Sequence, residues 1–480
     1  MRASAFVNKY LPYLLFFAFG LVFLAKPIMD LDEIWNYGFA SYVANGMQPY
    51  RDFSMIQTPL AAYLAAPVLR IFGDSLLVFR ILGAVLFSGV FGLLYTMCGS
   101  LIKNFPVAFA LSSFSGALCS LIWMYNYNHL MLLCIIVIIL MEYRLHTECT
   151  MPVWLLHLVI GLLFGMTPVI KQSTGAFLFL FNIMWCSYRL ATGAAEGKMW
   201  VLRIGAAIVP PTLFLLGTVI QGAFWDFFDY AVAGVKTFTH CEKWTDFIMN
   251  SPTDFIVGIF PLCVTLLSAY MVLSGKMHRH RIFLLETIGI CWAGAAVAYP
   301  ICDFVHASVA AIPFLIPLTC CIREIHMSKK DGVLCCLMAI LVLSCSAFLV
   351  FKELPKYKKC ELPHFVGLPI SQEIETQISV VDEYLLEAER DGIEVLIADE
   401  EAAAYMIPVE KYYKDFNLLL LGNVGSKTVE ELLWRENAIY LVAGTDEFFG
   451  KQAHRAVIEY IKENYTKVGE VLGFEAYRPR

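Results

Sequence analysis

Long apolar runs alternate with short polar segments over the first 351 residues of the chain. A helix needs about 20 predominantly apolar residues to cross roughly 30 Å of hydrocarbon. Eleven runs approach or reach this length, at about residues 10–29, 76–101, 106–124, 130–146, 153–170, 173–188, 201–222, 255–274, 282–301, 306–323 and 332–351. The pattern predicts an α-helical polytopic membrane protein with about 11 transmembrane helices.

The polar segment after the first run, at about residues 30–75, also contains helical patterns. Residues 34–45 and 59–72 carry apolar side chains at helical spacing. Gly46-Met47-Gln48-Pro49 and Gly73-Asp74-Ser75 interrupt these patterns. We therefore expect two short helices that lie at the membrane surface.

Residues 352–480 differ from the rest of the chain, because short apolar runs alternate there with amphipathic helical patterns. Residues 370–385 present one apolar helical face. The predicted strands are 395–398, 418–421 and 439–442, and the further predicted helices are 428–436 and 452–464. This pattern predicts a small α/β domain with a largely parallel sheet. The chain then divides into a transmembrane domain, residues 1–351, and a C-terminal domain, residues 352–480.

The composition agrees with this division. Only 16% of the residues are Asp, Glu, Lys or Arg and 59% are hydrophobic, which excludes a soluble protein of this length. Residues 352–480 hold 24 acidic and 15 basic residues, and no stripe of Lys and Arg runs along them. Binding to nucleic acid is not expected, because phosphate backbones require such a stripe.

Basic residues in alternate loops predict the orientation in the bilayer, because Lys and Arg accumulate on the cytoplasmic side. Thirteen of them fall on the side of the N-terminus: Arg2, Lys9, Lys103, Arg144, Arg189, Lys198, Arg203, Lys276, Arg279, Arg281, Arg323, Lys329 and Lys330. The opposite loops carry few bases and most of the acids. We expect a cytoplasmic N-terminus and an extracytoplasmic loop 30–75 and C-terminal domain.

Ionisable residues near the outer face form a small set drawn from four segments. Such groups are costly near a membrane, so each one is a candidate for function. They are Asp32, Glu33, Asp52, Arg80, Lys171, Asp303 and His306. We expect these carboxylates and cations to converge on one site for an anionic lipid phosphate and a group that needs a base.

The chemistry of sugar transfer from a polyprenyl phosphate requires such a set. A carboxylate takes the proton of the incoming hydroxyl, and cations stabilise the charge left on the phosphate. Asp32 and Glu33 are the candidate bases. The candidate phosphate-binding residues are Lys171, Arg80, His306 and Asp303. A divalent ion that bridges Asp32, Glu33 or Asp52 to the phosphate is a further hypothesis, and Asp52 is also a candidate acceptor-binding residue.

The first outer loop resembles that of the GT-C superfamily of polyprenyl-phosphate-sugar-dependent glycosyltransferases, in the bacterial branch related to aminoarabinose transferases and protein O-mannosyltransferases. The matching segments are Asp32-Glu33, Gly46-x-x-Pro49-Tyr50-x-Asp52, Thr58-Pro59-Leu60, Phe72-Gly73-x-Ser75 and Arg80. The resemblance implies that Asp32 is the base and that Lys171 contacts the donor phosphate. It also implies inversion at the anomeric carbon, a cell-envelope acceptor and a bacterial plasma membrane.

A second family pattern, Tyr-Pro-Arg-x-Asp-x-x-His, resembles residues 299–306 but with one departure. Tyr299-Pro300, Asp303 and His306 match, whereas Ile301 stands where the pattern has arginine. One donor contact that the resemblance implies is therefore missing, and Arg70 or Lys26 is the candidate to replace it.

Each candidate residue also has a purely structural interpretation. Asp32 could cap the helix that follows it, Asp52 could pair with Arg51, and Lys171 could reach the interface from a span end. Arg80 lies among apolar residues and needs a buried partner, which could be a ligand or Asp74. His306 could be a structural histidine.

Three functions compete at this stage. The first is a membrane glycosyltransferase that moves a monosaccharide from a polyprenyl-phosphate donor to a glycan, lipid or protein of the cell envelope. The second is a transporter or flippase for a lipid-linked or anionic solute, but we find neither the internal repeat nor the midplane charges typical of that class. The third is an inactive scaffold.

Overall fold

The computed structural model describes all residues except 1, 29–30, 121, 148–150, 194–196, 235–242, 277–280, 300, 323–328, 420–422, 434, 436 and 444–454. The chain folds as two units. The first comprises residues 1–23, 81–216 and 241–350, and the second comprises residues 24–80, 217–240 and 351–480.

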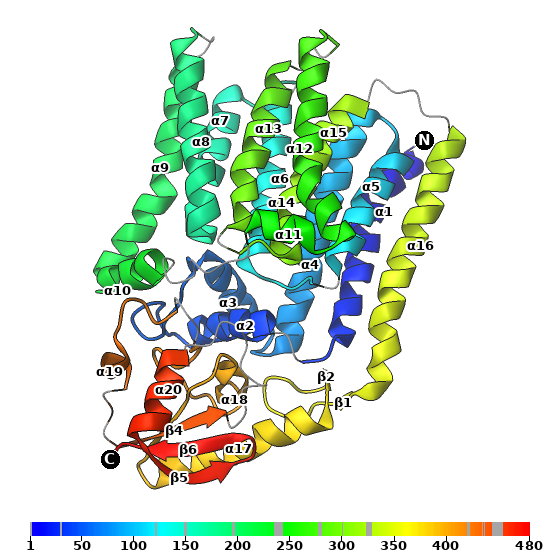
Figure 1. Ribbon diagram of the computed structural model, residues 1–480. Coiled ribbons are helices and arrows are strands. Elements are labelled where there is room, and N and C mark those ends of the chain that lie inside the picture. Colours follow the sequence, from blue (N-terminus) through cyan, green and yellow to red (C-terminus); the bar gives the residue numbers. More distant parts are fainter. Residues whose placement is uncertain are drawn as a thin grey trace. The chain divides into compact units, whose positions relative to one another are not determined.

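Long helices form the first unit, and a few of them continue by up to five residues into the ranges of the second (Figure 1). They are α1 (Arg2–Gly20) with its extension η1 (Leu21–Ala25), α4 (Leu76–Ile102), α5 (Phe105–Ser120), α6 (Tyr127–Leu145), α7 (Val153–Ile170), α8 (Gln172–Ala191), α9 (Gly197–Ile220), α12 (Pro252–Leu273), α13 (Arg281–Ala295) with η5 (Ala296–Ala298), α14 (Phe304–Ala311) with η6 (Ile312–Phe314) and α15 (Leu315–Ile322), and α16 (Lys329–Glu353). The short helix α11 (Trp244–Asn250) precedes α12. Each of the 11 predicted spans corresponds to one of these helical segments, so the predicted fold class is confirmed.

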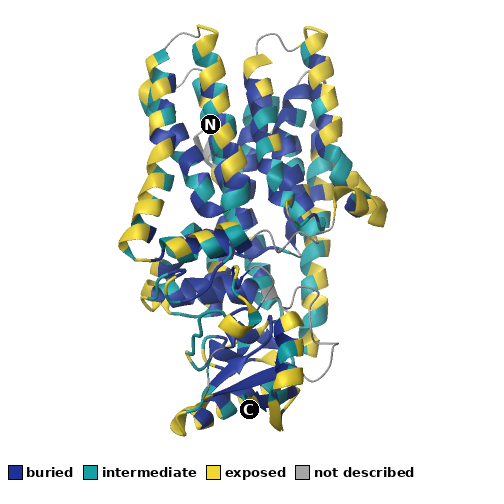
Figure 2. Cartoon of the chain, turned by 60° about the vertical axis from the view of Figure 1, so that its left-hand side comes forward, coloured by how far each residue is buried: buried dark blue, intermediate teal, exposed yellow. Residues whose placement is uncertain are grey.

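The surface of these helices indicates the surrounding solvent. Within the described residues, eight helices are long and apolar enough to cross a membrane, and three shorter apolar helices accompany them. Exposed positions run along the long helices (Figure 2). On α16 they include Leu334, Leu337 and Leu341, each about 60% exposed. Lipid accommodates such a surface whereas water does not, and the chain is a multi-pass membrane protein.

Two helices follow the first span, as the pattern of residues 30–75 predicts, and both lie in the second unit. They are α2 (Leu31–Ala44) and α3 (Leu60–Phe72). The Asp74 carboxylate ties the end of this segment back to α2, because it accepts hydrogen bonds from Tyr37 Oη at 2.9 Å and Ser41 Oγ at 2.7 Å. Asp74 is therefore occupied by α2.

The C-terminal residues form a mixed sheet with helices. The elements are β1 (Lys358–Lys359), β2 (Pro369–Ile370), α17 (Gln372–Arg390), β3 (Glu394–Ile397), α18 (Ala402–Met406), α19 (Val429–Leu432), β4 (Ala438–Ala443), α20 (Arg455–Asn464), β5 (Thr466–Val471) and β6 (Phe474–Arg478). The sheet order is β3-β4-β6-β5. Strands β3 and β4 are parallel, whereas β6 pairs antiparallel with both β4 and β5.

The prediction of a largely parallel sheet is therefore wrong. The missed element is the hairpin of β5 and β6, whose turn contains Gly473 at φ +87°, a conformation that glycine adopts readily. Five of the six residues of β5 are exposed, so this strand lacks the apolar run that marks a buried strand. Leu418 and Leu419 do not form a strand, and the rest of the predicted strand 418–421 lies outside the described residues.

Buried polar contacts join the C-terminal residues to the first loop within the second unit. Ser54 Oγ donates to Asn417 Oδ1 at 2.7 Å, and Asn423 Nδ2 donates to Ser54 Oγ at 3.1 Å. All three side chains are at most 1% exposed. The C-terminal residues thus share one unit with residues 24–80 and 217–240, and the division at residue 351 stays a prediction.

Candidate functional site

The first turn of α2 carries two of the predicted site residues. Asp32 is half-buried, and its Oδ1 accepts a hydrogen bond from Trp35 Nε1 at 3.0 Å. Its backbone carbonyl accepts from Asn36 Nδ2 at 2.7 Å. These contacts lie one turn along the same helix, so α2 itself sets the direction of the Asp32 carboxylate.

The neighbouring Glu33 forms a buried ion pair with Arg80, which lies in the second turn of α4. Nε and Nη2 of Arg80 donate to the two carboxylate oxygens of Glu33 at 3.0 and 2.6 Å. The side chains are 2% and 7% exposed. The remaining hydrogen bonds of Arg80 go to the backbone carbonyls of Leu24, Lys26 and Pro27. A guanidinium has five N–H donors, so Arg80 joins the end of the first span to α2 and α4.

Asp52 pairs with its sequence neighbour. Arg51 Nε and Nη2 each donate to the Asp52 carboxylate at 2.8 Å, and Gln48 N donates to it at 2.7 Å. The hydrogen bond from Arg51 lowers the pKa of Asp52, and partial burial opposes this only in part. Asp52 therefore does pair with Arg51, as its structural interpretation expected. The metal or acceptor role of Asp52 stays a prediction.

Lys171 is the single residue between α7 and α8. Its backbone is extended, its amide donates to Thr167 O at 3.1 Å, and its carbonyl accepts from Gly175 N at 2.8 Å. The turn is tight, because a Cβ on Gly175 would lie 2.2 Å from the Thr167 carbonyl. This turn presents the Lys171 side chain, which is 8% exposed, to the interior of the first unit.

A chain of hydrogen bonds links Lys171 to two other predicted residues. Lys171 Nζ donates to Asn128 Oδ1 at 3.0 Å and to the carbonyl of Val297 at 3.1 Å. The Asn128 amide nitrogen lies 3.3 Å from His306 Nε2, and His306 Nδ1 lies 2.8 Å from Asp303 Oδ1. The structure therefore brings Lys171, His306 and Asp303 together in the first unit, through a residue outside the predicted set.

We call the residues joined by these hydrogen bonds the lysine group; they are Asn128, Lys171, Val297, Asp303 and His306. Burial by itself would raise the pKa of Asp303, but hydrogen bonds from the ring and amide of His306 outweigh it and hold the pKa below its usual value. Tyr127 lies beneath the ammonium, with its ring centre 5.5 Å from Lys171 Nζ.

Asn128 is not among the candidate residues predicted from the sequence. A signal for Asn128 existed nonetheless, since Tyr127-Asn128-His129 is a polar segment at the start of a span.

Of the proposed replacements for the missing arginine, Arg70 donates to the carbonyls of Val43 and Ala44 at the end of α2. Pro300 lies outside the described residues.

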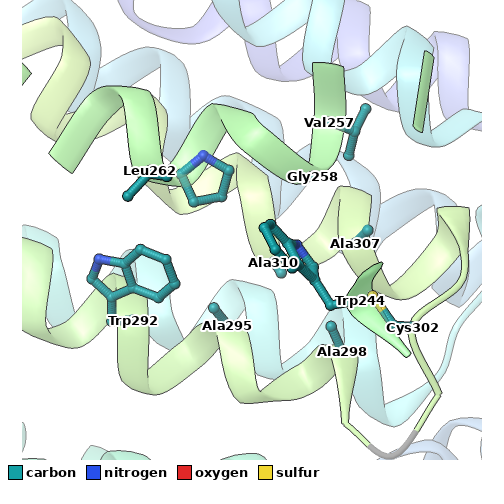
Figure 3. Close-up of a pocket in the computed structure, with 11 residues that line it drawn as sticks. Trp244, Val257, Gly258, Leu262, Trp292, Ala295, Ala298, Cys302, Ala307 and Ala310 are labelled. Atoms are coloured by element: carbon teal, nitrogen blue, oxygen red, sulfur yellow. The ribbon is translucent and has the colours of Figure 1, made fainter. Parts of the chain in front are cut away.

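The first unit also contains an apolar pocket (Figure 3). Its volume is about 350 Å³, and Trp244, Leu262 and Trp292 line it with smaller apolar residues. Three other lining residues, Ala298, Cys302 and Ala307, directly follow or precede Val297, Asp303 and His306 in the chain.

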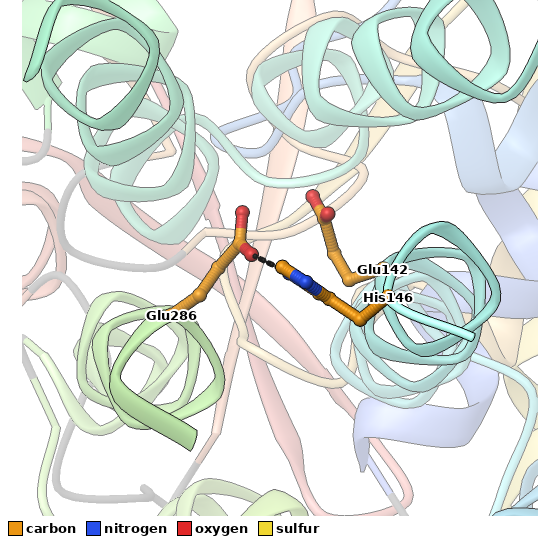
Figure 4. A group of neighbouring side chains, drawn as sticks. All are labelled: Glu142, His146 and Glu286. Atoms are coloured by element: carbon orange, nitrogen blue, oxygen red, sulfur yellow. Dashed lines mark hydrogen bonds and ion pairs between the residues drawn. The ribbon is translucent and has the colours of Figure 1, made fainter. Parts of the chain in front are cut away.

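A second polar cluster lies at the opposite end of α6. Glu142 of this helix and His146, the residue that follows the helix, meet Glu286 of α13 (Figure 4). Their candidate ligand atoms lie within 4.8 Å of one another, so the group could hold a metal ion. Arg203 Nη1 lies 2.6 Å from Glu142 and 3.7 Å from Glu286. The guanidinium therefore already balances part of the buried negative charge.

The metal hypothesis from the sequence concerned other residues, namely Asp32, Glu33 and Asp52. Within the described residues, Asp32, Glu33 and Asp52 do not form a group with metal-ligand spacing. The side chains of Glu33 and Asp52 are engaged by Arg80 and Arg51. Glu142 is 14 positions after Asn128 in α6, which corresponds to about 21 Å of helix. A metal at Glu142 would thus lie far from the lysine group.

No family model and no curated protein matches this sequence. Solved structures do match its fold. ArnT from Cupriavidus metallidurans in the apo state is 11% identical with a TM-score of 0.60, covering 99% of this chain and 98% of that chain. The fold is that of the GT-C glycosyltransferases.

Two further structures share the GT-C fold. ArnT from the same organism bound to undecaprenyl phosphate is 10% identical with a TM-score of 0.55, over 99% of this chain and 98% of that one. The Archaeoglobus fulgidus oligosaccharyltransferase in complex with Zn and sulfate is 11% identical with a TM-score of 0.53, over 96% of this chain and 72% of that one.

Proposed function

We propose that this protein is a membrane glycosyltransferase that moves a monosaccharide from a polyprenyl-phosphate donor to an extracytoplasmic acceptor of the cell envelope. The observation that carries the proposal is the lysine group in a chain with the GT-C fold. One of the matching structures, ArnT, is bound to undecaprenyl phosphate. A buried ammonium on a tight, rigid turn suits the recognition of such a phosphate.

The apolar pocket, whose lining includes sequence neighbours of the lysine group, supports a lipid-linked donor. Its lining is almost entirely aliphatic and aromatic, and three residues of its wall directly follow or precede Val297, Asp303 and His306 in the chain. A ligand with a charged phosphate and an apolar tail could therefore satisfy both features. A water-soluble nucleotide sugar would leave the apolar pocket without a matching group.

The base in this proposal is Asp32. Its carboxylate takes the proton of the acceptor hydroxyl as that oxygen attacks the anomeric carbon. The bond from the anomeric carbon to the phosphate oxygen breaks, and its electron pair leaves with the polyprenyl phosphate. Attack opposite to the leaving group inverts the configuration. Lys171 stabilises the charge that develops on the phosphate.

Glu33 and Arg80 have a different task in this scheme from the one expected from the sequence. Their side chains bind each other and the carbonyls of residues 24–27. Phosphate binding by Arg80 would require it to leave these acceptors. We therefore assign both residues to holding the first turn of α2, and with it Asp32.

The proposal also includes an orientation in the membrane. The N-terminus is cytoplasmic, and loop 30–75 and the C-terminal residues lie on the extracytoplasmic side.

The test uses purified protein, a radiolabelled polyprenyl-phosphate sugar and a cell-envelope extract. We expect wild type to label the acceptor and Asp32→Asn to lose at least 100-fold in rate, a typical size for a missing general base. Asp391→Asn, at the exposed end of α17, is the matched control and should retain full activity. Transfer by Asp32→Asn at the wild-type rate would refute the base, and no transfer by wild type with any such donor would refute the function.

A further inference from the structure

We propose that Asn128 is a positioning residue of the donor-phosphate site: its amide aims the Lys171 ammonium and fixes the tautomer of His306. The inference rests on the proposed function, and it adds a residue outside the predicted set. Asn128 lies in the first turn of α6 and is 3% exposed. Its neighbour Asn126 caps this helix by accepting from His129 N at 2.9 Å, so the backbone that carries Asn128 is fixed.

The direction of the Asn128 amide follows from its two partners. An ammonium has only donors, so the atom that faces Lys171 Nζ at 3.0 Å must be the carbonyl oxygen. The other end of the same amide, the NH₂ group, then faces His306 Nε2 at 3.3 Å. An amide reversed end for end would place donors against Lys171, which excludes that arrangement.

The tautomer of His306 follows from the amide. Because Asn128 donates to Nε2, this ring nitrogen accepts and carries no proton. The ring proton is then on Nδ1, where Asp303 Oδ1 accepts it at 2.8 Å. The same oxygen also accepts from the backbone amide of His306 at 2.8 Å, so Asp303, the partner of Nδ1, is held at the start of α14. The four side chains form one directed chain of hydrogen bonds from Lys171 to Asp303.

The chemical identity of Asn128 determines what this chain can do. A neutral amide orients the ammonium while leaving its positive charge to act on an anionic ligand. A carboxylate at the same position would pair with Lys171 and compete with phosphate for that charge. It would also accept a hydrogen bond from a protonated Nε2, and so favour a proton on the nitrogen that carries none in wild type. Aspartate differs from asparagine little in shape, so Asn128→Asp separates charge and proton position from packing.

The first experiment measures binding of undecaprenyl phosphate to the purified protein in nanodiscs. We expect Asn128→Asp to weaken binding at least tenfold and Asn128→Ala to weaken it less, because alanine removes the orientation but adds no competing charge. Lys171→Ala should abolish specific binding. Asn464→Asp at the exposed end of α20 is the matched control and should bind like wild type.

The second experiment separates positioning from a general structural defect. With a radiolabelled donor, Asn128→Asp should raise KM for the donor at least tenfold and change kcat much less, with a melting temperature close to that of wild type. Nitrogen NMR of ¹⁵N-histidine-labelled protein should show His306 with an unprotonated Nε2, identified by its loss in His306→Gln. In Asn128→Asp this nitrogen should become protonated.

The outcomes distinguish this inference from the proposed function. If wild type and Lys171→Ala differ in binding but Asn128→Asp binds as tightly as wild type, the role of Asn128 is refuted and the function stands. If Lys171→Ala binds as tightly as wild type, the donor-phosphate site is refuted and Asn128 has no role in it. A wild-type His306 protonated at Nε2 would refute the tautomer independently of any binding result.

Discussion

Arg80 and Glu33 form a bidentate ion pair, with Nη2 2.6 Å and Nε 3.0 Å from the two carboxylate oxygens. The pair joins the beginning of α4 to the first turn of α2, next to Asp32. Both side chains are buried, so each depends on the other to compensate the loss of hydration. Through this contact, a residue far from Asp32 in sequence binds the helical turn that carries the proposed base.

Removal of one partner of this pair should destabilise the protein. Glu33→Gln leaves the Arg80 charge buried without its counterion, which typically costs about 3–5 kcal/mol in the free energy of unfolding. The double variant Glu33→Leu with Arg80→Met should recover much of this loss, because no charge then remains buried. Thermal unfolding of purified protein tests both. Equal melting temperatures of Glu33→Gln and wild type would contradict the proposed interdependence.

Gly175→Ala should disturb the turn that presents Lys171. The added Cβ would lie 2.2 Å from the carbonyl of Thr167, so α7 and α8 must separate. We expect a lower melting temperature and weaker binding of undecaprenyl phosphate. Gly205→Ala is the matched control, since nothing lies within 4 Å of a Cβ there and alanine favours a helix by up to about 1 kcal/mol. Unchanged lipid binding in Gly175→Ala would show that the turn tolerates the methyl group.

Asp382 should make stability depend on pH. Its carboxyl lies on the buried face of α17, and burial raises its pKa to about 8. A raised folded-state pKa means that the protein is most stable where the carboxyl is protonated, and stability falls as pH rises from about 4 towards 8. Asp382→Asn should therefore match wild type near pH 4 and exceed it by a few kcal/mol near pH 8.

Thermal unfolding at several pH values tests the role of Asp382. The matched control is Glu383→Gln, which removes the neighbouring exposed carboxylate and should change the melting temperature little at any pH. We expect the melting temperature of wild type to fall relative to that of Asp382→Asn between pH 5 and pH 8. A rise relative to the variant would contradict the prediction.

Asn417→Ala should loosen the C-terminal residues. The variant leaves Ser54 without one buried hydrogen-bond partner, which costs about 1–3 kcal/mol. Because Ser54 and Asn417 are 363 residues apart in sequence, the loss should appear as faster proteolysis within the second unit. Asn464→Ala removes a comparable but exposed amide and serves as the control. Equal proteolysis rates for the two variants would argue against this contact as a tie.

The apolar pattern by itself determined the class of protein and the place of its helices. Run length places a helical segment at each of the 11 predicted spans, and α2 and α3 begin and end within three residues of the predicted ranges. The reason is local: a transmembrane helix satisfies its backbone internally and needs only enough apolar residues to cross the bilayer. Polar residues at the ends of these runs also indicated Asp32, Lys171 and Asp303 as candidates.

The tertiary structure decided which of these residues act on one another. Glu33 and Arg80 are 47 residues apart, and Asn128 and His306 are 178 residues apart. Such contacts depend on how helices pack, which periodicity along the chain does not encode. The antiparallel hairpin of β5 and β6 was missed for a related reason, since its first strand is exposed and its pairing with β4 is non-local. The sequence therefore supplied the candidate charges, and packing assigned each of them its partner.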